Sequence, residues 1–149
     1  MGETFTGVKN EKLTRILSLG FAVAAVAVAA GLALIQPKEL VPQLASKTAA
    51  PAVFHTGPNV LYRSKHIPGS IYAGPGSTSA GLEMLKAEAG KLPRDREIVI
   101  YCGCCPWDRC PNIKPAMEML QSMGFGKVKA LYLPVGFKAD WIDLSYPIK

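Results

Sequence analysis

All four cysteines of this 149-residue chain lie within residues 102–110, in the segment CGCCPWDRC. They directly follow residues 97–101, EIVIY, an apolar run of the kind that forms a buried strand. A thiol that ends a strand and precedes a loop and a helix faces loop amides and a helix N-terminus, which both favour the thiolate. We therefore expect the chemistry of the protein in this loop, and Cys102, at the strand end, is the first candidate for an activated thiol.

The residue types of the loop leave other interpretations open. Outside the cytoplasm, Cys110 could form a disulfide with Cys102 or Cys104 and make a thiol–disulfide or persulfide-resolving site, whereas a bridge between adjacent Cys104 and Cys105 would be strained. Four thiolates could also hold zinc, copper or an iron–sulfur cluster. The spacing Cys-x-Cys-Cys-x4-Cys matches none of the common metal motifs, so the sequence predicts no metal and no cofactor.

Short apolar runs between turn residues predict the strands that position this loop. Strands are expected at residues 52–54, within 64–73, at 97–101 and at 128–133. Because helical segments separate the last three runs by short links, the strands should pair in parallel and give an α/β fold. In such sheets reactive sites lie at the carboxyl ends of strands, which is where Cys102 stands.

Two amphipathic helices are expected between the strands. Apolar side chains recur at helical spacing in two stripes: Leu82, Leu85 and Ala89, and then Ile113, Ala116, Met117, Leu120 and Met123. Ser77, Thr78 or Ser79 would cap the first helix and Asn112 the second, while Gly124 would end the second. The helices should therefore cover the sheet and leave the cysteine loop at its edge.

A long apolar run precedes the predicted domain. Residues 16–35 carry no charge, and about 20 residues suffice to span the hydrocarbon core of a bilayer. Lys9, Lys12 and Arg15 come before the run, which favours a cytoplasmic N-terminus. A cleaved signal peptide is the alternative, although no small-x-small cleavage site directly follows Ile35.

These boundaries predict a single-pass membrane protein with one extracytoplasmic, periplasmic domain. Residues 1–15 would be the cytoplasmic N-terminus, 16–35 the transmembrane helix, 36–51 a proline-containing linker, and 52–149 the folded domain. The formal net charge of +6 comes from scattered Lys and Arg residues without interleaved aromatics, so no nucleic-acid partner is expected. A modest positive field is compatible with a small anionic ligand.

Three segments occur in an order and at a spacing typical of one known family. They are residues 66–71 (HIPGSI), residues 92–102 (LPRDREIVIYC), and residues 123–128 (MGFGKV) together with Trp141 and residues 146–148 (YPI). Over residues 52–148 the sequence thereby resembles rhodanese-like domains, the sulfurtransferase family. The resemblance implies a rhodanese-like parallel sheet flanked by helices, here preceded by one transmembrane helix.

The resemblance also implies a reaction. Family members use a cysteine thiolate to take sulfane sulfur from a small sulfur-containing anion, such as thiosulfate, and pass it to a thiol or other nucleophilic acceptor. Carried over by position, Cys102 would be the nucleophile, Gly103 part of the amide cradle for the anion, and Arg109 the cationic side chain that binds it. Cys105 and Cys110 would be additional loop or resolving thiols.

The sequence departs from the family pattern around the same loop. Arg109 lies seven positions after Cys102 but five after Cys104, and five is the common family spacing, so Cys104 is a rival nucleophile. The loop is enlarged by about five residues, and His55-Thr56-Gly57 stands where the family has Asp-x-Arg. These departures keep two alternatives open: a non-catalytic accessory subunit of a membrane protein complex, and a metal-binding module. Both histidines, His55 and His66, are expected to be structural.

Overall fold

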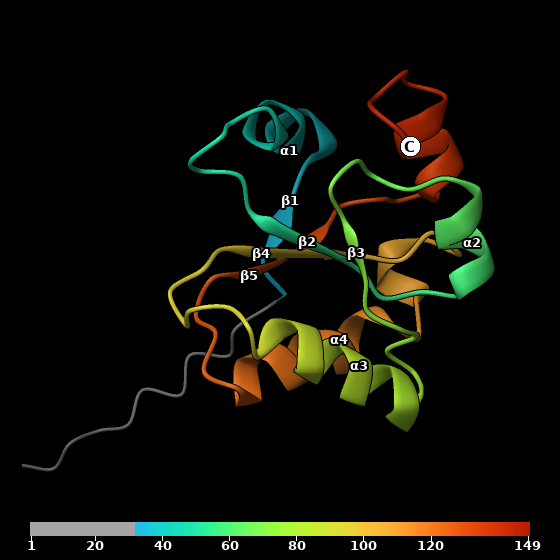
Figure 1. The fold of residues 1–149 in the computed structure, drawn as a ribbon. Coiled ribbons are helices and arrows are strands. Elements are labelled where there is room, and N and C mark those ends of the chain that lie inside the picture. Colours follow the sequence, from blue (N-terminus) through green and yellow to red (C-terminus); the bar gives the residue numbers. More distant parts are fainter. Residues whose placement is uncertain (1–31) are drawn as a thin grey trace, which may run out of the picture.

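The computed structural model describes residues 32–149, and its centre is a five-stranded sheet in which all paired strands are parallel (Figure 1). The strands are β1 (Leu34–Ile35), β2 (Ala52–His55), β3 (Ile71–Tyr72), β4 (Ile98–Tyr101) and β5 (Val128–Leu131). Their order across the sheet is β1-β5-β4-β2-β3. The predicted parallel α/β fold is thus confirmed, and β1 is an additional strand at the sheet edge.

Helices cover both faces of this sheet. They are α1 (Pro37–Leu44), α2 (Asn59–Ser64), α3 (Ser79–Ala89) and α4 (Ile113–Ser122), with a 3₁₀ helix at Trp107–Arg109 and a π-helical turn at Lys138–Ile142. Helices α3 and α4 lie on one face, and α1 and the C-terminal turn lie on the other (Figure 1). Both predicted amphipathic helices are confirmed, and the Thr78 side chain caps α3 by accepting a hydrogen bond from the Gly81 amide at 3.0 Å.

Strand β4 shows how the sequence builds two cores from one sheet. Side chains alternate between the faces of a strand, so Ile98 and Ile100 pack with the α3 and α4 layer while Val99 and Tyr101 pack on the opposite side with Trp141. All four residues of β4 are buried. This two-sided burial is why β4 reads as a continuous apolar run, and it fixes the strand that carries Cys102 at its end.

The prediction of a linker at residues 36–51 is wrong. Helix α1 occupies half of this segment, and its Leu40 side chain is fully buried in the core on the α1 face. Pro37 stands in the first helical turn, where its missing N–H costs nothing, and the Glu39 carboxylate accepts a hydrogen bond from the Gln36 amide at 2.8 Å. Pro37 therefore begins helix α1, Pro42 lies inside it, and the folded domain begins before residue 52.

The predicted transmembrane helix at residues 16–35 lies mainly outside the described residues. Its last two positions, Leu34 and Ile35, are strand β1 and pair with Ala130 and Leu131 of β5, so the predicted boundary at residue 35 is wrong. Among the residues that the structure describes, no helix combines the length and the apolar character needed to cross a bilayer.

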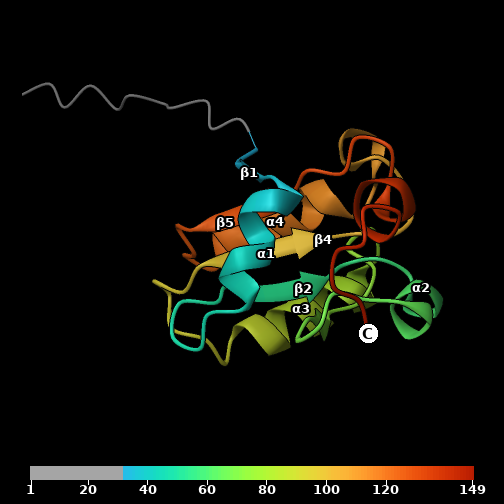
Figure 2. The ribbon, with the colours of Figure 1, turned by 90° about the horizontal axis from the view of Figure 1, so that it is seen from above.

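The carboxyl ends of β2 and β4 meet at one edge of the sheet, toward α2 and the C-terminal turn (Figure 2). The register pairs His55 with Tyr101, and the Thr56 amide donates to the Tyr101 carbonyl at 2.8 Å. Gly57, two residues after β2, and Cys102, the residue after β4, are thereby brought side by side. Parallel pairing of the two central strands thus creates the surroundings of the cysteine loop.

Candidate active site

The loop after β4 gathers three sulfur atoms into one cluster. The Sγ atoms of Cys102, Cys104 and Cys110 all lie within 4.8 Å of one another, with 3.0 Å between Cys102 and Cys104 and 3.8 Å between Cys104 and Cys110. Cys102 and Cys110 are buried, with 3% and 7% of their surface exposed, whereas Cys104 faces solvent. We call these three residues the thiol cluster. Its arrangement gives one exposed sulfur in contact with two buried ones.

Cys105 is adjacent to the thiol cluster but outside it. Its Sγ lies 2.8 Å from that of Cys104, and its side chain is half-buried. Its pKa is raised to about 12, chiefly by desolvation and by hydrogen bonding to Cys104. All four cysteines are free thiols, so none of the disulfides considered from the sequence is formed.

A short 3₁₀ helix brings Cys110 back to the strand end. The Trp107 amide donates to the Leu133 carbonyl at 3.0 Å, and the indole ring lies against Tyr132 with ring centroids 6.0 Å apart. These contacts fix the middle of the loop to the segment after β5. The loop then reverses, so Cys110 reaches the sulfur of Cys102 from the start of α4.

Asn112 is a functional residue that the sequence interpretation missed. It was expected to cap α4, but its side chain makes no capping hydrogen bond. Its amide nitrogen instead donates to the sulfurs of Cys102 at 3.4 Å and Cys104 at 3.9 Å, while its amide oxygen accepts from the Ser77 amide at 3.0 Å. An amide donor aimed at two sulfurs stabilises negative charge on either one.

Gly57 forms the other wall beside Cys102. A Cβ atom at this position would lie 2.7 Å from Cys102 Sγ and 3.1 Å from the His55 ring, so only glycine leaves room for the thiol. The sequence interpretation noted Gly57 only as part of the segment that stands where the family has Asp-x-Arg. Its role depends on the register of β2 against β4, which no local sequence signal reveals.

His55 is buried at the same strand end and is neutral. Burial and the nearby His66 lower the pKa of His55 to about 4. Its Nδ1 accepts from the Gly57 amide at 3.3 Å, which leaves the hydrogen on Nε2, and Nε2 has no partner among the described residues. A Cβ atom at Gly103 would lie 3.5 Å from Nε2, so this N–H lies next to Gly103.

The pKa values of Cys102 and Cys110 are shifted in opposite directions. Hydrogen bonding from Cys102 is the main cause that lowers the pKa of Cys110 to about 5, and the backbone N–H of Asn112 contributes as well. The same interaction, together with burial, raises the pKa of Cys102. The pKa shift of Cys102 is therefore opposite to the one expected from the sequence, because its interaction with Cys110 and its burial both favour the protonated thiol.

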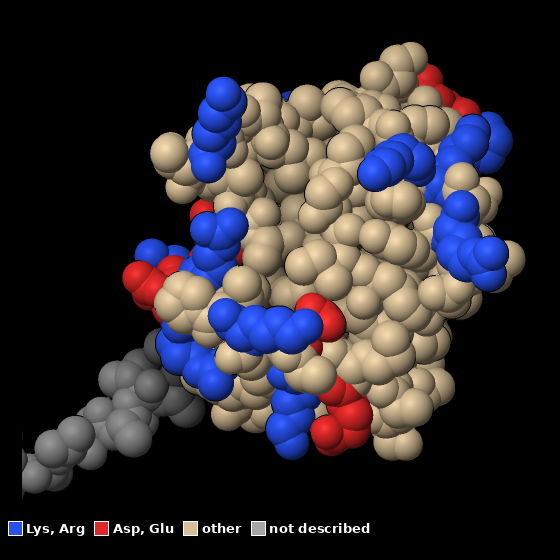
Figure 3. Space-filling model, in the orientation of Figure 1, with Lys and Arg blue, Asp and Glu red and all other residues tan. Residues whose placement is uncertain are grey.

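The remaining predicted site residues lie around the thiol cluster. Gly103 is half-buried, and a Cβ atom at this position would lie 3.5 Å from His55 Nε2 and 3.7 Å from Leu61 Cβ. Arg109 ends the 3₁₀ helix, and its side chain is exposed. On the face seen in Figure 3, Lys and Arg side chains stand near the left and right edges and in the lower part, where Asp and Glu lie beside them, and the centre of the face is largely uncharged.

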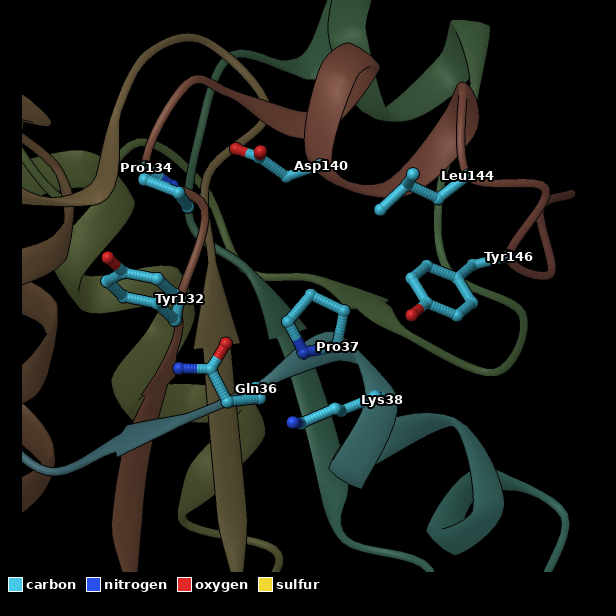
Figure 4. A pocket seen from close by; sticks show the side chains of 8 residues that line it. All are labelled: Gln36, Pro37, Lys38, Tyr132, Pro134, Asp140, Leu144 and Tyr146. Atoms are coloured by element: carbon cyan, nitrogen blue, oxygen red, sulfur yellow. The ribbon is translucent and has the colours of Figure 1, made fainter.

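A pocket of about 230 Å³ opens near the same edge of the sheet, beyond the ends of β1 and β5 (Figure 4). It is lined by Gln36, Pro37, Lys38, Tyr132, Pro134, Asp140, Leu144 and Tyr146. None of the four cysteines lines it, and the Asp140 carboxylate already accepts from the amides of Val135 and Gly136. The thiol cluster is therefore not part of this pocket.

Comparison with known proteins identifies the fold. No family model matches the chain, and a search of curated proteins finds no match. Among solved structures, the rhodanese-like domain of the Alr3790 protein from Anabaena sp. has a TM-score of 0.56 at 22% identity, covering 78% of this chain and 77% of that one. The single-domain sulfurtransferase RDL2 of Saccharomyces cerevisiae has a TM-score of 0.58 at 14% identity, covering 78% and 94%.

A third structure, the BH2092 protein of Bacillus halodurans, has a TM-score of 0.61 at 19% identity and covers 78% of this chain and 76% of that one. At these identities the likeness establishes the fold. The described domain therefore has the rhodanese-like fold, as its motifs indicated, and the thiol cluster occupies the carboxyl edge of its sheet.

Proposed function

We propose that the protein transfers sulfane sulfur, with Cys102 as the nucleophile. The observation that carries this proposal is the position of Cys102 directly after the central strand of a rhodanese-like sheet, with its sulfur beside Gly57, the Asn112 amide and two further thiols. A buried thiol with a polar donor and two neighbouring thiols is a site for covalent chemistry at sulfur.

The reaction begins when Cys102 loses its proton to solvent. The resulting Cys102 thiolate attacks the outer sulfur of a donor such as thiosulfate. A sulfur–sulfur bond forms on Cys102, the sulfur–sulfur bond of the donor breaks, and sulfite leaves with the electron pair. The Asn112 amide, which donates to the Cys102 sulfur, stabilises the negative charge while it resides there.

Cys104 provides a route from the buried persulfide to solvent. Its exposed sulfur lies 3.0 Å from that of Cys102. The Cys104 thiolate would attack the outer sulfur of the persulfide and regenerate the Cys102 thiolate, and an external thiol would then take the sulfur from Cys104. In this scheme Cys104 is the second carrier, and the donor anion binds near Arg109 and the Gly103 amide.

The location of the reaction is also part of the proposal. The uncharged run at residues 16–35, preceded by Lys9, Lys12 and Arg15, supports a membrane-anchored protein with its domain outside the cytoplasm. Since β1 begins at Leu34, the anchor would end directly at the folded domain, without the linker expected from the sequence. N-terminal sequencing of the mature protein tests this, and a start within residues 30–50 would exclude the anchor.

Three single substitutions test the role of Cys102. The reduced protein is exposed to thiosulfate or polysulfide, and its intact mass is measured for the addition of one sulfur atom. Cys102→Ser should abolish the adduct and the transfer, because a hydroxyl cannot carry a persulfide. Cys104→Ser should keep the adduct and slow its removal by an external thiol, while Cys105→Ser serves as the control. An adduct in Cys102→Ser with none in Cys104→Ser would move the nucleophile to Cys104.

Arg109 is tested by a charge-matched pair of variants. Arg109→Ala should weaken use of an anionic donor about 10–150-fold in kcat/KM, mainly through KM, which corresponds to a lost charge-assisted hydrogen bond of about 1.5–3 kcal/mol. Arg94→Ala removes the same charge before β4, at the opposite edge of the sheet, where Arg94 stacks on Phe125. Equal effects of the two substitutions would show that Arg109 acts only through the net charge.

A further inference from the structure

We propose that the thiol cluster of Cys102, Cys104 and Cys110 is also a binding site for one Cu(I) ion. With metal–sulfur bonds of about 2.3 Å, three sulfurs arranged trigonally around a metal are separated by about 4 Å. The observed separations of 3.0 Å and 3.8 Å, and a maximum of 4.8 Å within the trio, bracket that value. A small movement of the exposed Cys104 side chain brings all three sulfurs to bonding distance.

The ligand set selects a soft ion of low coordination number. All three donors are sulfur, and this is the only group of three or more Cys, His, Asp or Glu ligands found close together in residues 32–149. Thiolates favour Cu(I), whereas Mg²⁺, Ca²⁺ and Mn²⁺ favour oxygen ligands. Structural Zn²⁺ takes four ligands, and Cys105, although next to Cys104, is not part of the trio. Three sulfurs in a partly buried site therefore fit Cu(I) better than Zn²⁺.

The surroundings of the trio fit a bound thiolate complex. The Asn112 amide donates to the sulfurs of Cys102 and Cys104, which is the kind of outer contact that orients metal ligands. Helix α4 begins at Ile113, directly after Asn112, so the positive end of its dipole lies close in the chain to this donor. Because Cys102 and Cys110 are buried while Cys104 is exposed, the ion would enter and leave by exchange of thiol ligands at Cys104.

Binding requires no oxidant or reductant. Copper stays in its monovalent state, copper–sulfur bonds form as a thiol carrier in solution releases the ion, and each cluster thiol that binds loses its proton to the buffer. Since Cys102 cannot be both a copper ligand and a persulfide, copper should block addition of sulfur to Cys102. The inference is independent of the proposed sulfur transfer, because the ligand geometry stands whether or not the site is catalytic.

The test is a competition for Cu(I) between the full chain, reduced and kept free of oxygen, and a chromogenic Cu(I) chelator of known affinity. The wild type should bind one Cu(I) and show thiolate-to-copper absorption in the ultraviolet. Cys104→Ser should weaken binding by at least about 100-fold, since loss of an outer-shell partner alone costs about 10–100-fold. Cys104 is exposed, so its replacement leaves the core intact. Cys105→Ser, the matched control, should bind as the wild type does.

The possible results separate this inference from the proposed function. No binding, or equal losses in Cys104→Ser and Cys105→Ser, would overturn the copper site even if the protein forms a persulfide. Tetrahedral Zn²⁺ or Co²⁺ binding that outcompetes Cu(I) and requires Cys105 would overturn it as well. Copper binding with no sulfur adduct on any cysteine would support this inference and refute the sulfur transfer.

Discussion

Gly57→Ala is expected to destabilise the protein through one contact. The added Cβ would lie 2.7 Å from Cys102 Sγ, roughly 1 Å inside the optimal non-bonded separation of about 3.5–4.0 Å. Overpacking of this kind costs about 1–3 kcal/mol of unfolding free energy. Gly126→Ala is the matched control, because no heavy atom lies within 4 Å of its added Cβ. The control should change stability by less than about 0.5 kcal/mol.

A double-mutant cycle identifies the atom responsible. In a Cys102→Ala background the sulfur is absent, and only the 3.1 Å approach to the His55 ring remains, so Gly57→Ala should cost clearly less than in the wild type. Urea unfolding of the full chain in detergent and reductant, followed by tryptophan fluorescence, gives the four free energies. A coupling energy of at least about 0.5 kcal/mol is expected for contacting residues. Additive effects would refute the placement of Gly57 against Cys102.

Two further substitutions test other parts of the structure. Leu40→Ala should lower the unfolding free energy by about 2–5 kcal/mol, because this side chain of α1 is fully buried. Val60 is exposed, so Val60→Ala should have little effect. Similar small losses for both variants in urea unfolding would support a linker at residues 36–51. His55, with a pKa of about 4 in the folded state against 6.5 for a free histidine, binds its proton more readily when unfolded, so stability should fall as pH is lowered from 6.5, by about 3 kcal/mol at pH 4. Unfolding measured across this range should show a flatter profile in His55→Gln, and an unchanged profile would contradict the assignment.

The fold could be predicted where short-range patterns and burial agree. Strand β4 is buried on both faces, so its apolar run is continuous, and the stripes of α3 and α4 have the helical period of elements that cover one side of a sheet. Helix α2 could not be found in this way, because none of its residues is buried and it therefore has no apolar stripe. Strand β1 could not be distinguished from the sequence, because Leu34 and Ile35 are the last two residues of the uncharged apolar run at residues 16–35.

The candidate site was located from sequence, but its internal roles were not. Chain position alone placed Cys102 at the end of a strand. The contacts that define its chemistry come from elsewhere: Gly57 is set beside it by the register of β2, and Asn112 by the return of the loop. An asparagine before a helix predicts a cap. The Asn112 side chain instead donates to the sulfurs of Cys102 and Cys104, which only the three-dimensional structure brings within reach. The pKa order of Cys102 and Cys110 likewise follows from their mutual contact.

The direction of strand β1 determines which edge of the sheet would face the membrane in an anchored protein. Because β1 runs parallel to β5, the chain enters the domain at the amino edge of the sheet, where Ala33 neighbours Glu97 and Lys127. Cys102 stands at the opposite, carboxyl edge. A membrane tether at residue 33 would therefore hold the sheet with its thiols directed away from the lipid. A partner that exchanges sulfur or copper with Cys104 would then approach from the aqueous side, so the anchor would restrict where the protein acts without covering its reactive end.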